Sequence, residues 1–194
     1  MKKCHCGKEV DEFGRHGLSC QSSAGRHSRH SQGNEIIKRA LCSAQIPSIR
    51  EPQGLERDNG KRPDGLTLIP WSKGKSIVWD FKVSDTLASS HFQHTSHEAA
   101  KSAAQAEAKK ISHYQNLTSG YIVMPVAMET LGSIGPMTMQ FIKDLGSRII
   151  DVTGDKRAKN YLFQRLGMAV QRGNAASIMG TVPSGQKLYE LYYL

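Results

Sequence analysis

The chain has 194 residues, of which 38% are hydrophobic and 22% are charged. These values are typical of one globular domain with a sizeable core, with room left for a small appendage. No stretch is long and apolar enough to cross a membrane, and the N-terminal residues lack the apolar segment of a signal peptide. We therefore expect an intracellular protein with no membrane partner.

The charge balance is strongly basic, with 26 Lys and Arg residues against 17 Asp and Glu and a formal net charge of +9. A charge of this sign and size favours a polyanionic partner. Nucleic acid ranks ahead of a membrane surface because no basic amphipathic helix is evident. The alternative is a basic protein without such a partner.

Residues 1–25 are rich in Gly, Ser, Cys and His and are too polar to form a core. Cys4, Cys6, His16 and Cys20 are of the residue types that bind tetrahedral zinc, and a loop of this size needs a metal in order to fold. We predict a structural Zn²⁺ site here, with free thiols as the alternative; His5 competes with His16 as a ligand.

Residues 26–33 are predicted to form a basic connector between this motif and the main domain. Arg26, His27, Arg29 and His30 follow one another closely in it. The functional interpretation is a nucleic-acid-binding clamp for phosphate groups, and the alternative is a solvated linker.

Apolar periodicity begins at Asn34 and predicts a folded domain over 34–180, with 181–194 as a tail. Asn34 is expected to cap the first helix, and Cys42 to be a small buried residue within it. Pro125 places its strand at an edge or an end of the sheet. The predicted elements, in chain order, are a helix over 34–45, a strand in 47–52, paired strands in 64–70 and 75–84, a helix over 96–117, a strand over 121–129, and helices over 135–154 and 159–178. Their order indicates an α/β fold with a small mixed central sheet flanked by helices.

Two carboxylates and a lysine interrupt the apolar pattern of the paired strands. Asp64 begins the first strand, while Asp80 and Lys82 lie two residues apart in the second and so share one face. Two adjacent carboxylates raise each other's pKa unless a cation neutralises them, and oxygen ligands suit Mg²⁺ or Mn²⁺. A metal and a lysine beside a basic surface suit chemistry on a phosphodiester. The alternative is an Asp80–Lys82 ion pair on a solvated strand face.

Pro63-Asp64 followed by Asp80-Phe81-Lys82 resembles the PD-(D/E)xK motif of restriction-like endonucleases, which also place helices before and after the hairpin. Nearly the whole chain is similar to the C-terminal region of reverse-transcriptase proteins of non-LTR retrotransposons. The similarity rests on the cysteine–histidine motif followed by GRHSRH, NEIIKRAL, GKRPDGLTLIPW and FQRLGMAVQR. In that family a zinc motif precedes such an endonuclease. No reverse-transcriptase segment accompanies these motifs, so we expect a stand-alone or excised portion.

The resemblance implies that Asp64 and Asp80 are ligands of the catalytic metal and that Lys82 is the catalytic lysine. Family members often carry an acid on the first helix, which makes Glu35 a candidate third ligand. The alternative for Glu35 is a solvated residue in the first helical turn, where a carboxylate is favoured.

Lys110 and Tyr114 lie four residues apart and share one face of the helix predicted over 96–117. The resemblance implies a basic or polar residue near the scissile phosphate from this helix, so both residues are candidate members of the catalytic site. An aromatic residue at the edge of the core is the alternative for Tyr114.

The interpretation that combines these features is a Mg²⁺-dependent PD-(D/E)xK endonuclease with a structural zinc motif and no small-molecule cofactor. Its polymer partner is expected to be DNA, with RNA as the alternative, and its location the nucleus. The competing interpretation is a non-catalytic nucleic-acid-binding module that retains the nuclease fold. His91, His94 and His97 fall in a polar segment predicted to be a loop, and we expect no role for them.

Overall fold

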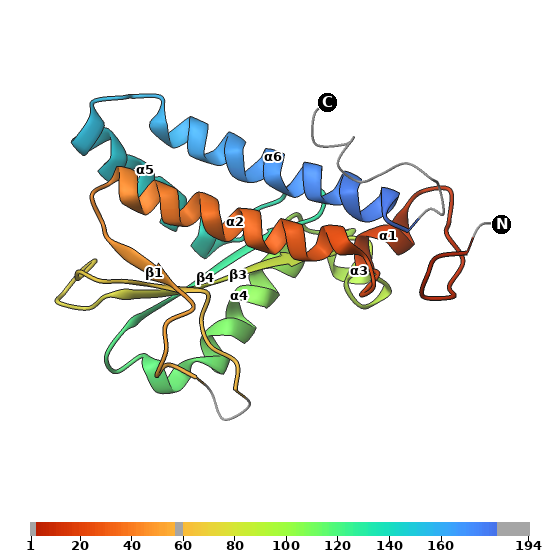
Figure 1. Cartoon of the computed structure of the whole chain (residues 1–194), viewed down its shortest axis with the longest axis horizontal. Helices are drawn as coiled ribbons and strands as arrows, with labels where there is room; N and C mark the ends of the chain where they lie inside the picture. The colour runs from red at the N-terminus through yellow and green to blue at the C-terminus, as the bar shows by residue number, and fades with distance from the viewer. Residues whose placement is uncertain (1–2, 57–59, 182–194) are drawn as a thin grey trace.

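The computed structural model describes residues 3–56 and 60–181 of the chain (Figure 1). The helices and strands of these ranges are, in chain order, α1 (Arg15–Ser19), α2 (Ala24–Ser43), β1 (Ser48–Arg50), β2 (Gly65–Thr67), β3 (Ile77–Ser84), α3 (Ser89–Thr95), α4 (Lys101–His113), the 3-10 helix η1 (Gln115–Leu117), β4 (Ile122–Glu129), α5 (Pro136–Thr153) and α6 (Ala158–Met179). No helix in this part of the chain is long and apolar enough to span a membrane.

The strands form one mixed sheet in the order β1-β2-β3-β4. β1 with β2 and β2 with β3 pair antiparallel, whereas β3 and β4 run parallel with Asp80 opposite Pro125. β4 lies at the edge of the sheet, where a residue without a backbone N–H is tolerated. The predicted α/β class with a small mixed sheet is therefore confirmed, and so is the edge position of the strand that contains Pro125.

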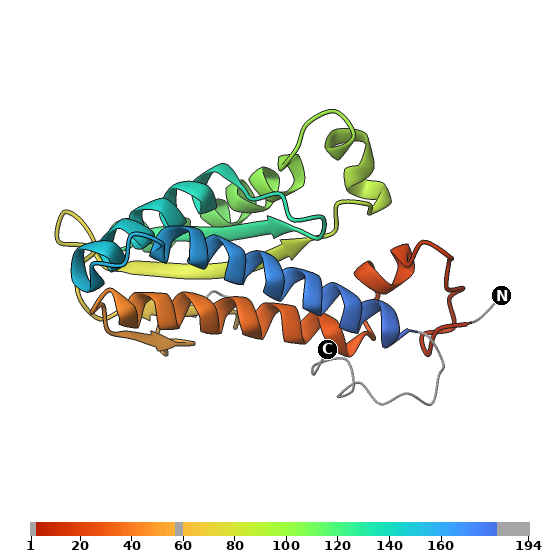
Figure 2. The same cartoon turned by 90° about the horizontal axis from the view of Figure 1, so that it is seen from above.

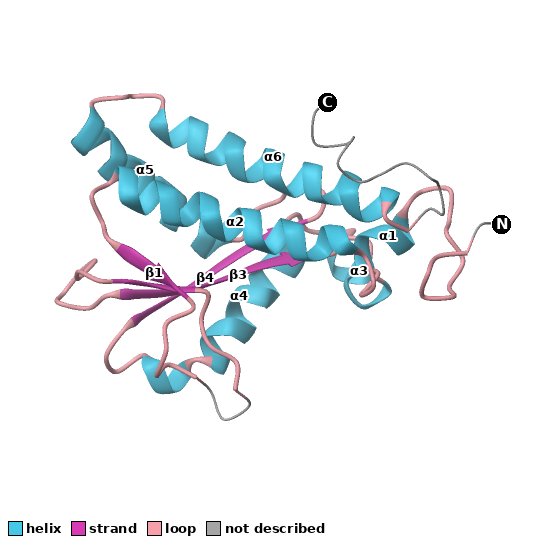
Figure 3. Cartoon of the chain, in the orientation of Figure 1, coloured by secondary structure: helices cyan, strands magenta, loops and turns pink. Residues whose placement is uncertain are grey.

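Helices cover both faces of this sheet. α2 and α5 lie with α6 on one side, and α4 lies on the other (Figures 1 and 3). α2 and α6 run side by side along the length of the molecule (Figure 2). The core between the sheet and the first helix layer includes Ile37, Trp79, Phe81, Leu145 and Leu166, each almost completely buried.

Strand β3 alternates between these two environments and thereby positions the candidate site. Trp79 and Phe81 face α2, where the ring of Phe81 packs so closely against Gly33 that a Cβ there would collide with it. Asp80, between them in sequence, faces α4 and accepts a hydrogen bond from Tyr114 of the segment that follows that helix. The period-two pattern of the sequence thus places the Asp80 carboxylate on the face of the sheet that α4 covers.

Helix α2 begins at Ala24, so the prediction of a connector over 26–33 and a cap at Asn34 is wrong. Asn34 is buried in the middle of the helix. The early turns lack an apolar stripe because small and polar residues make their buried contacts: Gly25 packs against Ser177, and Arg29 bonds to Asn174.

Other local predictions also differ from the structure. The polar segment expected to be a loop contains helix α3, and the helix expected from residue 96 begins at Lys101. Cys42 is exposed, because the buried face of α2 runs through Ile37, Leu41 and Ala44. Nearly all of the predicted tail, residues 182–194, lies outside the described part of the chain.

Candidate metal centres

A cluster of three polar side chains lies beside α2, at the start of β2 and the middle of β3. One ligand atom each from His30, Asp64 and Asp80 lie within 4.8 Å of one another, so that the group could hold a metal ion. Asp64 directly precedes β2, and its backbone N–H donates to the carbonyl of Trp79 at 2.9 Å, which ties it to β3. The sheet register therefore brings together the two carboxylates predicted from the sequence, and α2 adds a histidine.

Asp64 is held from two sides. Its Oδ2 accepts a hydrogen bond from the backbone N–H of Phe81 at 2.7 Å and lies 3.0 Å from Nε2 of His30. Burial acts to raise the pKa of Asp64, but hydrogen bonding and electrostatic attraction from His30, with the Phe81 amide, outweigh it. The pKa of Asp64 is therefore lower than its ordinary value, and the carboxylate is ionised at neutral pH.

Asp80 is more deeply buried, with a side chain 9% exposed, and its neighbours come from α4. Lys110 Nζ lies 2.6 Å from its Oδ1, and the Tyr114 hydroxyl donates to its Oδ2 at 2.8 Å. Lys110 and Tyr114 share one helical face, so a single turn supplies both groups. The structure thus brings Lys110 and Tyr114 to the predicted site as direct partners of a carboxylate, and it buries Tyr114.

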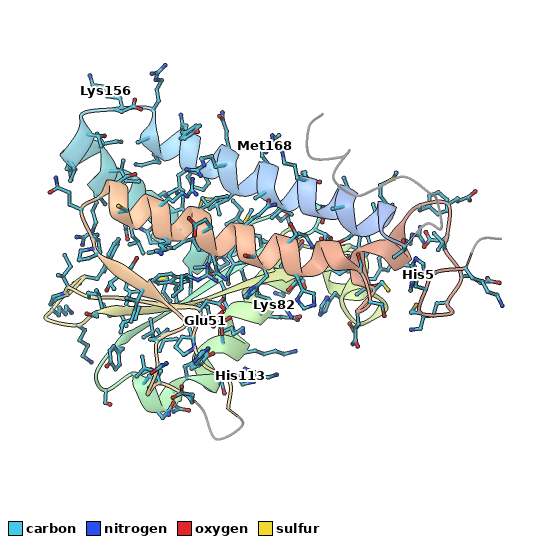
Figure 4. The ribbon with its side chains drawn as sticks, viewed as in Figure 1. His5, Glu51, Lys82, His113, Lys156 and Met168 are labelled. Carbon is cyan, nitrogen blue, oxygen red and sulfur yellow. The ribbon has the colours of Figure 1, made fainter. Side chains whose placement is uncertain are left out.

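Lys82 lies between α2 and α4 on the open side of the cluster (Figure 4). A cavity of about 340 Å³ is lined there by Lys82 and Lys110 together with His27 and His30. A second cavity of about 300 Å³ shares the two lysines and adds Lys61, Lys109, His91 and His113. The two cavities share Lys82 and Lys110, and we call them together the lysine cavity.

Glu35 is not part of this cluster. Its carboxylate accepts a hydrogen bond from Arg39 at 2.8 Å, and this bond holds the pKa of Glu35 below its ordinary value. It lines a groove between α2 and α6 together with Arg165 and Arg172, away from Asp64 and Asp80. His30, five residues earlier on the same helix, is the side chain of α2 that joins Asp64 and Asp80.

The four residues expected to clamp phosphate lie in different environments. His27 is exposed and lines the lysine cavity, and His30 joins the carboxylates. Arg29 borders the same cavity but is only 4% exposed, and its guanidinium is engaged within the protein: it donates to Asn174 Oδ1 at 2.7 Å and to the carbonyl of Leu18 at 3.0 Å. Arg29 therefore ties α1 and α6 to α2. Arg26 belongs to α2, but its side chain lies outside the described part of the structure.

The N-terminal cluster gathers the four predicted zinc ligands. Cys4 Sγ and Cys20 Sγ lie 3.7 Å apart, and Cys6 Sγ lies 3.3 Å from His16 Nε2. Sulfur ligands at about 2.3 Å from a tetrahedral zinc lie roughly 3.8 Å from each other, whereas a disulfide joins sulfurs at about 2.05 Å. All four ligand atoms lie within 4.8 Å of one another, so this cluster could hold a metal such as zinc.

Local hydrogen bonds shape this cluster further. The Asp11 carboxylate accepts three backbone N–H groups at the start of α1, and the bond from His16, at 2.8 Å, is the main cause of its lowered pKa. A backbone hydrogen bond from Lys8 lowers the pKa of Cys6, which favours the thiolate that metals bind. Burial raises the pKa of Cys20. His5 is exposed and does not belong to the group of four ligands.

The histidines near α3 form no metal group among the described side chains. His91 Nδ1 lies 3.0 Å from the backbone carbonyl of Asp85, where its N–H donates, and His97 is exposed. The side chain of His94 lies outside the described part of the chain.

Sequence reasoning missed two functions of polar residues. It treated His30 as a phosphate clamp, although its spacing of four from Asn34 places both residues on one helical face. It also missed the buried carboxylate of Glu107, which accepts hydrogen bonds from the first turn of α5, because a glutamate in an alanine-rich helix has the pattern of a solvated residue.

No protein-family model matches this sequence, and no curated protein matches it.

Proposed function

We propose that this chain is a metal-dependent DNA endonuclease in which Asp64 and Asp80 hold Mg²⁺ or Mn²⁺ and the N-terminal cluster holds a structural zinc ion. The observation that carries this proposal is the convergence of two carboxylates and a histidine from separate elements beside a lysine-lined cavity. Strands are depleted in Asp, and a carboxylate that is placed in a buried site next to another is typical of an ion-binding or catalytic site.

The residues fit a hard divalent cation. Carboxylate oxygens are the ligands that Mg²⁺ prefers, and two of them on a rigid sheet leave positions for water and a substrate phosphate. The ligand atoms of the cluster lie within 4.8 Å of one another, so Asp64 and Asp80 would each offer a carboxylate oxygen to one such cation.

The protein groups around the carboxylates suit hydrolysis of a phosphodiester. A bound Mg²⁺ supplies an activated water and neutralises charge on the phosphate. Lys82 projects into the cavity beside Asp80, where its ammonium stabilises charge that develops on the phosphate oxygens. Tyr114 and Lys110 fix the orientation of Asp80 through its two oxygens.

The lysine cavity supplies the electrostatics for a polyanionic substrate. Lys61, Lys82, Lys109 and Lys110 line it, the described lining residues include no carboxylate, and the whole chain carries a formal charge of +9. Binding to DNA by such a surface is governed by release of counterions from the phosphates. We expect binding by the isolated chain to be salt-sensitive and largely independent of sequence.

The contact between Lys110 and Asp80 favours a second candidate function. An ammonium at 2.6 Å neutralises Asp80 without any metal, as a carboxylate in a purely structural ion pair would be neutralised. A non-catalytic nucleic-acid-binding module that retains this fold would keep such a pair. It would bind DNA through the lysine cavity and cleave nothing.

Nicking of supercoiled plasmid separates the two functions. The endonuclease proposal predicts nicking when Mg²⁺ or Mn²⁺ is added and none when the ion is left out; no chelator is used, because it would also strip the zinc cluster. Lys82→Ala should lose most of the nicking and keep DNA binding within about threefold, since a single phosphate contact carries only part of the affinity. Lys143→Ala, an exposed lysine on α5, is the matched control. Salt-sensitive DNA binding with no nicking in either ion would support the binding module.

A further inference from the structure

A chain of hydrogen bonds leads from the core of the protein to the candidate metal centre. The indole Nε1 of Trp79 donates to Asn34 Oδ1 at 2.9 Å, and Asn34 Nδ2 lies 3.4 Å from His30 Nδ1. The other ring nitrogen of His30, Nε2, lies 3.0 Å from Asp64 Oδ2. Trp79 and Asn34 are both fully buried, so that the inner end of this chain is shielded from water.

The architecture of α2 makes this chain possible. His30 and Asn34 are one helical turn apart on the face of α2 that lies against β3. Gly33 allows the close approach, because a side chain at this position would collide with the ring of Phe81. That ring also meets His30 edge-on, with the ring centroids 6.2 Å apart, which limits rotation of the imidazole.

The chemistry of the groups orients this chain from its inner end. An indole nitrogen can only donate, so the Asn34 side chain must turn its oxygen toward Trp79 and its NH₂ toward His30. An NH₂ group can only donate, and the Asn34 side chain also hydrogen-bonds the Asp64 carboxylate; facing His30 Nδ1 at 3.4 Å, it favours the tautomer in which the Nδ1 lone pair accepts. In this tautomer the ring proton lies on Nε2, which faces Asp64 Oδ2 at 3.0 Å and donates to it.

This direction decides which atoms face a metal. A histidine that binds a metal through Nε2 carries its proton on Nδ1 and donates it to an oxygen acceptor. Asn34 offers a donor at that position instead of an acceptor, so the lone pair of Nε2 is not available as a ligand. The oxygens of Asp64 and Asp80 are then the ligands that the cluster presents.

We propose that Asn34 is a positioning residue that determines metal specificity: it keeps His30 as an N–H donor to Asp64 and so gives the centre an all-oxygen ligand set. Such a set selects hard cations, Mg²⁺ and Mn²⁺, whereas a histidine ligand would shift the preference toward Zn²⁺ and Co²⁺. The metal-binding part of this inference rests on the proposed function; the proton position of His30 does not.

Two-bond ¹H–¹⁵N correlation NMR on the metal-free centre, at neutral pH and without DNA, reads the proton position directly. The zinc cluster is kept loaded in this sample. The expected result is a protonated Nε2 and an unprotonated Nδ1 for His30. A proton on Nδ1 would overturn the proposal whether or not the protein cleaves DNA, and absence of cleavage would leave this result standing.

Asn34→Asp is designed to reverse the tautomer, because its second carboxylate oxygen would accept a hydrogen bond from a protonated Nδ1 of His30, and the lone pair would then lie on Nε2. With the N-terminal cluster filled by zinc, this variant should bind added Co²⁺ at least about tenfold more tightly than the wild type. Ser31→Asp, an exposed position on the same helix, adds the same charge without contacting Nδ1 and is the matched control. An equal gain in both variants would mean that charge alone is responsible, and it would refute the role of Asn34.

His30→Gln gives a second test that does not place a charge in the core. A glutamine NH₂ can replace the Nε2–H donor but supplies no imidazole lone pair, so Mn²⁺ affinity measured by electron paramagnetic resonance should stay within about twofold of the wild type. A loss of tenfold or more would show that His30 is a ligand. A wild type that binds no Mn²⁺ outside the zinc cluster would end both the metal-selection role of Asn34 and the proposed function.

Discussion

Replacement of Lys110 by Met tests how Asp80 is neutralised. Methionine keeps most of the length of the side chain but removes the ammonium that lies 2.6 Å from Asp80 Oδ1. Removing one partner of a buried ion pair costs about 3–5 kcal/mol. The side chain of Lys110 is 25% exposed, so water screens part of this cost, and we expect a loss of about 2–3 kcal/mol in the free energy of unfolding.

That loss corresponds to a fall in Tm of roughly 5–10 °C for a chain of this size. A divalent cation bound by Asp64 and Asp80 would replace the missing charge, so that Lys110→Met should regain stability when Mn²⁺ is added. A ligand at a hundred times its Kd stabilises by about 2.7 kcal/mol. The wild type should gain less, because Lys110 already neutralises Asp80 and repels the cation.

Thermal melts with and without Mn²⁺ are the assay, and two further variants serve as controls. Lys109→Met removes an exposed charge from the adjacent position and should leave Tm within about 2 °C of the wild type. Adding Asp80→Asn to Lys110→Met should restore stability without metal, since the buried charge is gone. Equal gains from Mn²⁺ in the wild type and in Lys110→Met would refute the view that ammonium and cation neutralise the same carboxylate.

Three further predictions concern the N-terminal cysteine–histidine cluster, the fall in stability at acid pH and the buried carboxylate of Glu107. Chelation should abolish hydrogen-exchange protection in residues 3–23 while the sheet stays protected, and protein prepared without chelator but free of zinc would contradict this. Because the pKa of Asp64 is lowered in the folded state, its contribution to stability is complete above about pH 4 and is lost as the pH falls through the lowered value. Asp64→Asn should therefore lose less stability than the wild type when melts are measured at falling pH. An unchanged dependence of Tm on acid pH would contradict the lowered pKa. Glu107→Gln should lower the free energy of unfolding by about 2–3 kcal/mol in urea titrations, since its carboxylate accepts the N–H groups of Met137 and Thr138 at the start of α5, whereas the exposed Glu98→Gln should cost under about 0.5 kcal/mol.

The order of helices and strands could be predicted from the sequence because apolar periodicity records burial. The alternation along β3 predicted that Trp79 and Phe81 share one face and Asp80 the other, and the sheet register brings Asp64 to the same end. The cysteine and histidine spacing likewise predicted which four side chains gather near the N-terminus. In each case the pattern is local, within one strand, one hairpin or one short loop.

The first turns of α2 could not be predicted, because their stability comes from contacts that are distant in sequence and polar in chemistry. Arg29 meets Asn174 across a separation of 145 residues, and no periodic signal encodes such a pair. Because residues 26–33 were predicted to be a connector, the position of His30 beside Asp64 could not be predicted either, since a residue in a connector has no fixed neighbours. Glu35 was preferred as the acidic residue of this helix, although its phase on α2 turns it toward Arg39 and away from the sheet.

The most direct test of the proposed endonuclease is to measure cleavage and binding of DNA on the same zinc-loaded preparations. The wild type should nick plasmid in Mg²⁺, while Asp64→Asn and Asp80→Asn should each abolish nicking and still bind DNA in a salt-sensitive way. Asp151→Asn, an exposed carboxylate on α5, should keep both properties. Nicking that continues at the wild-type rate in Asp80→Asn would contradict the assignment of this site.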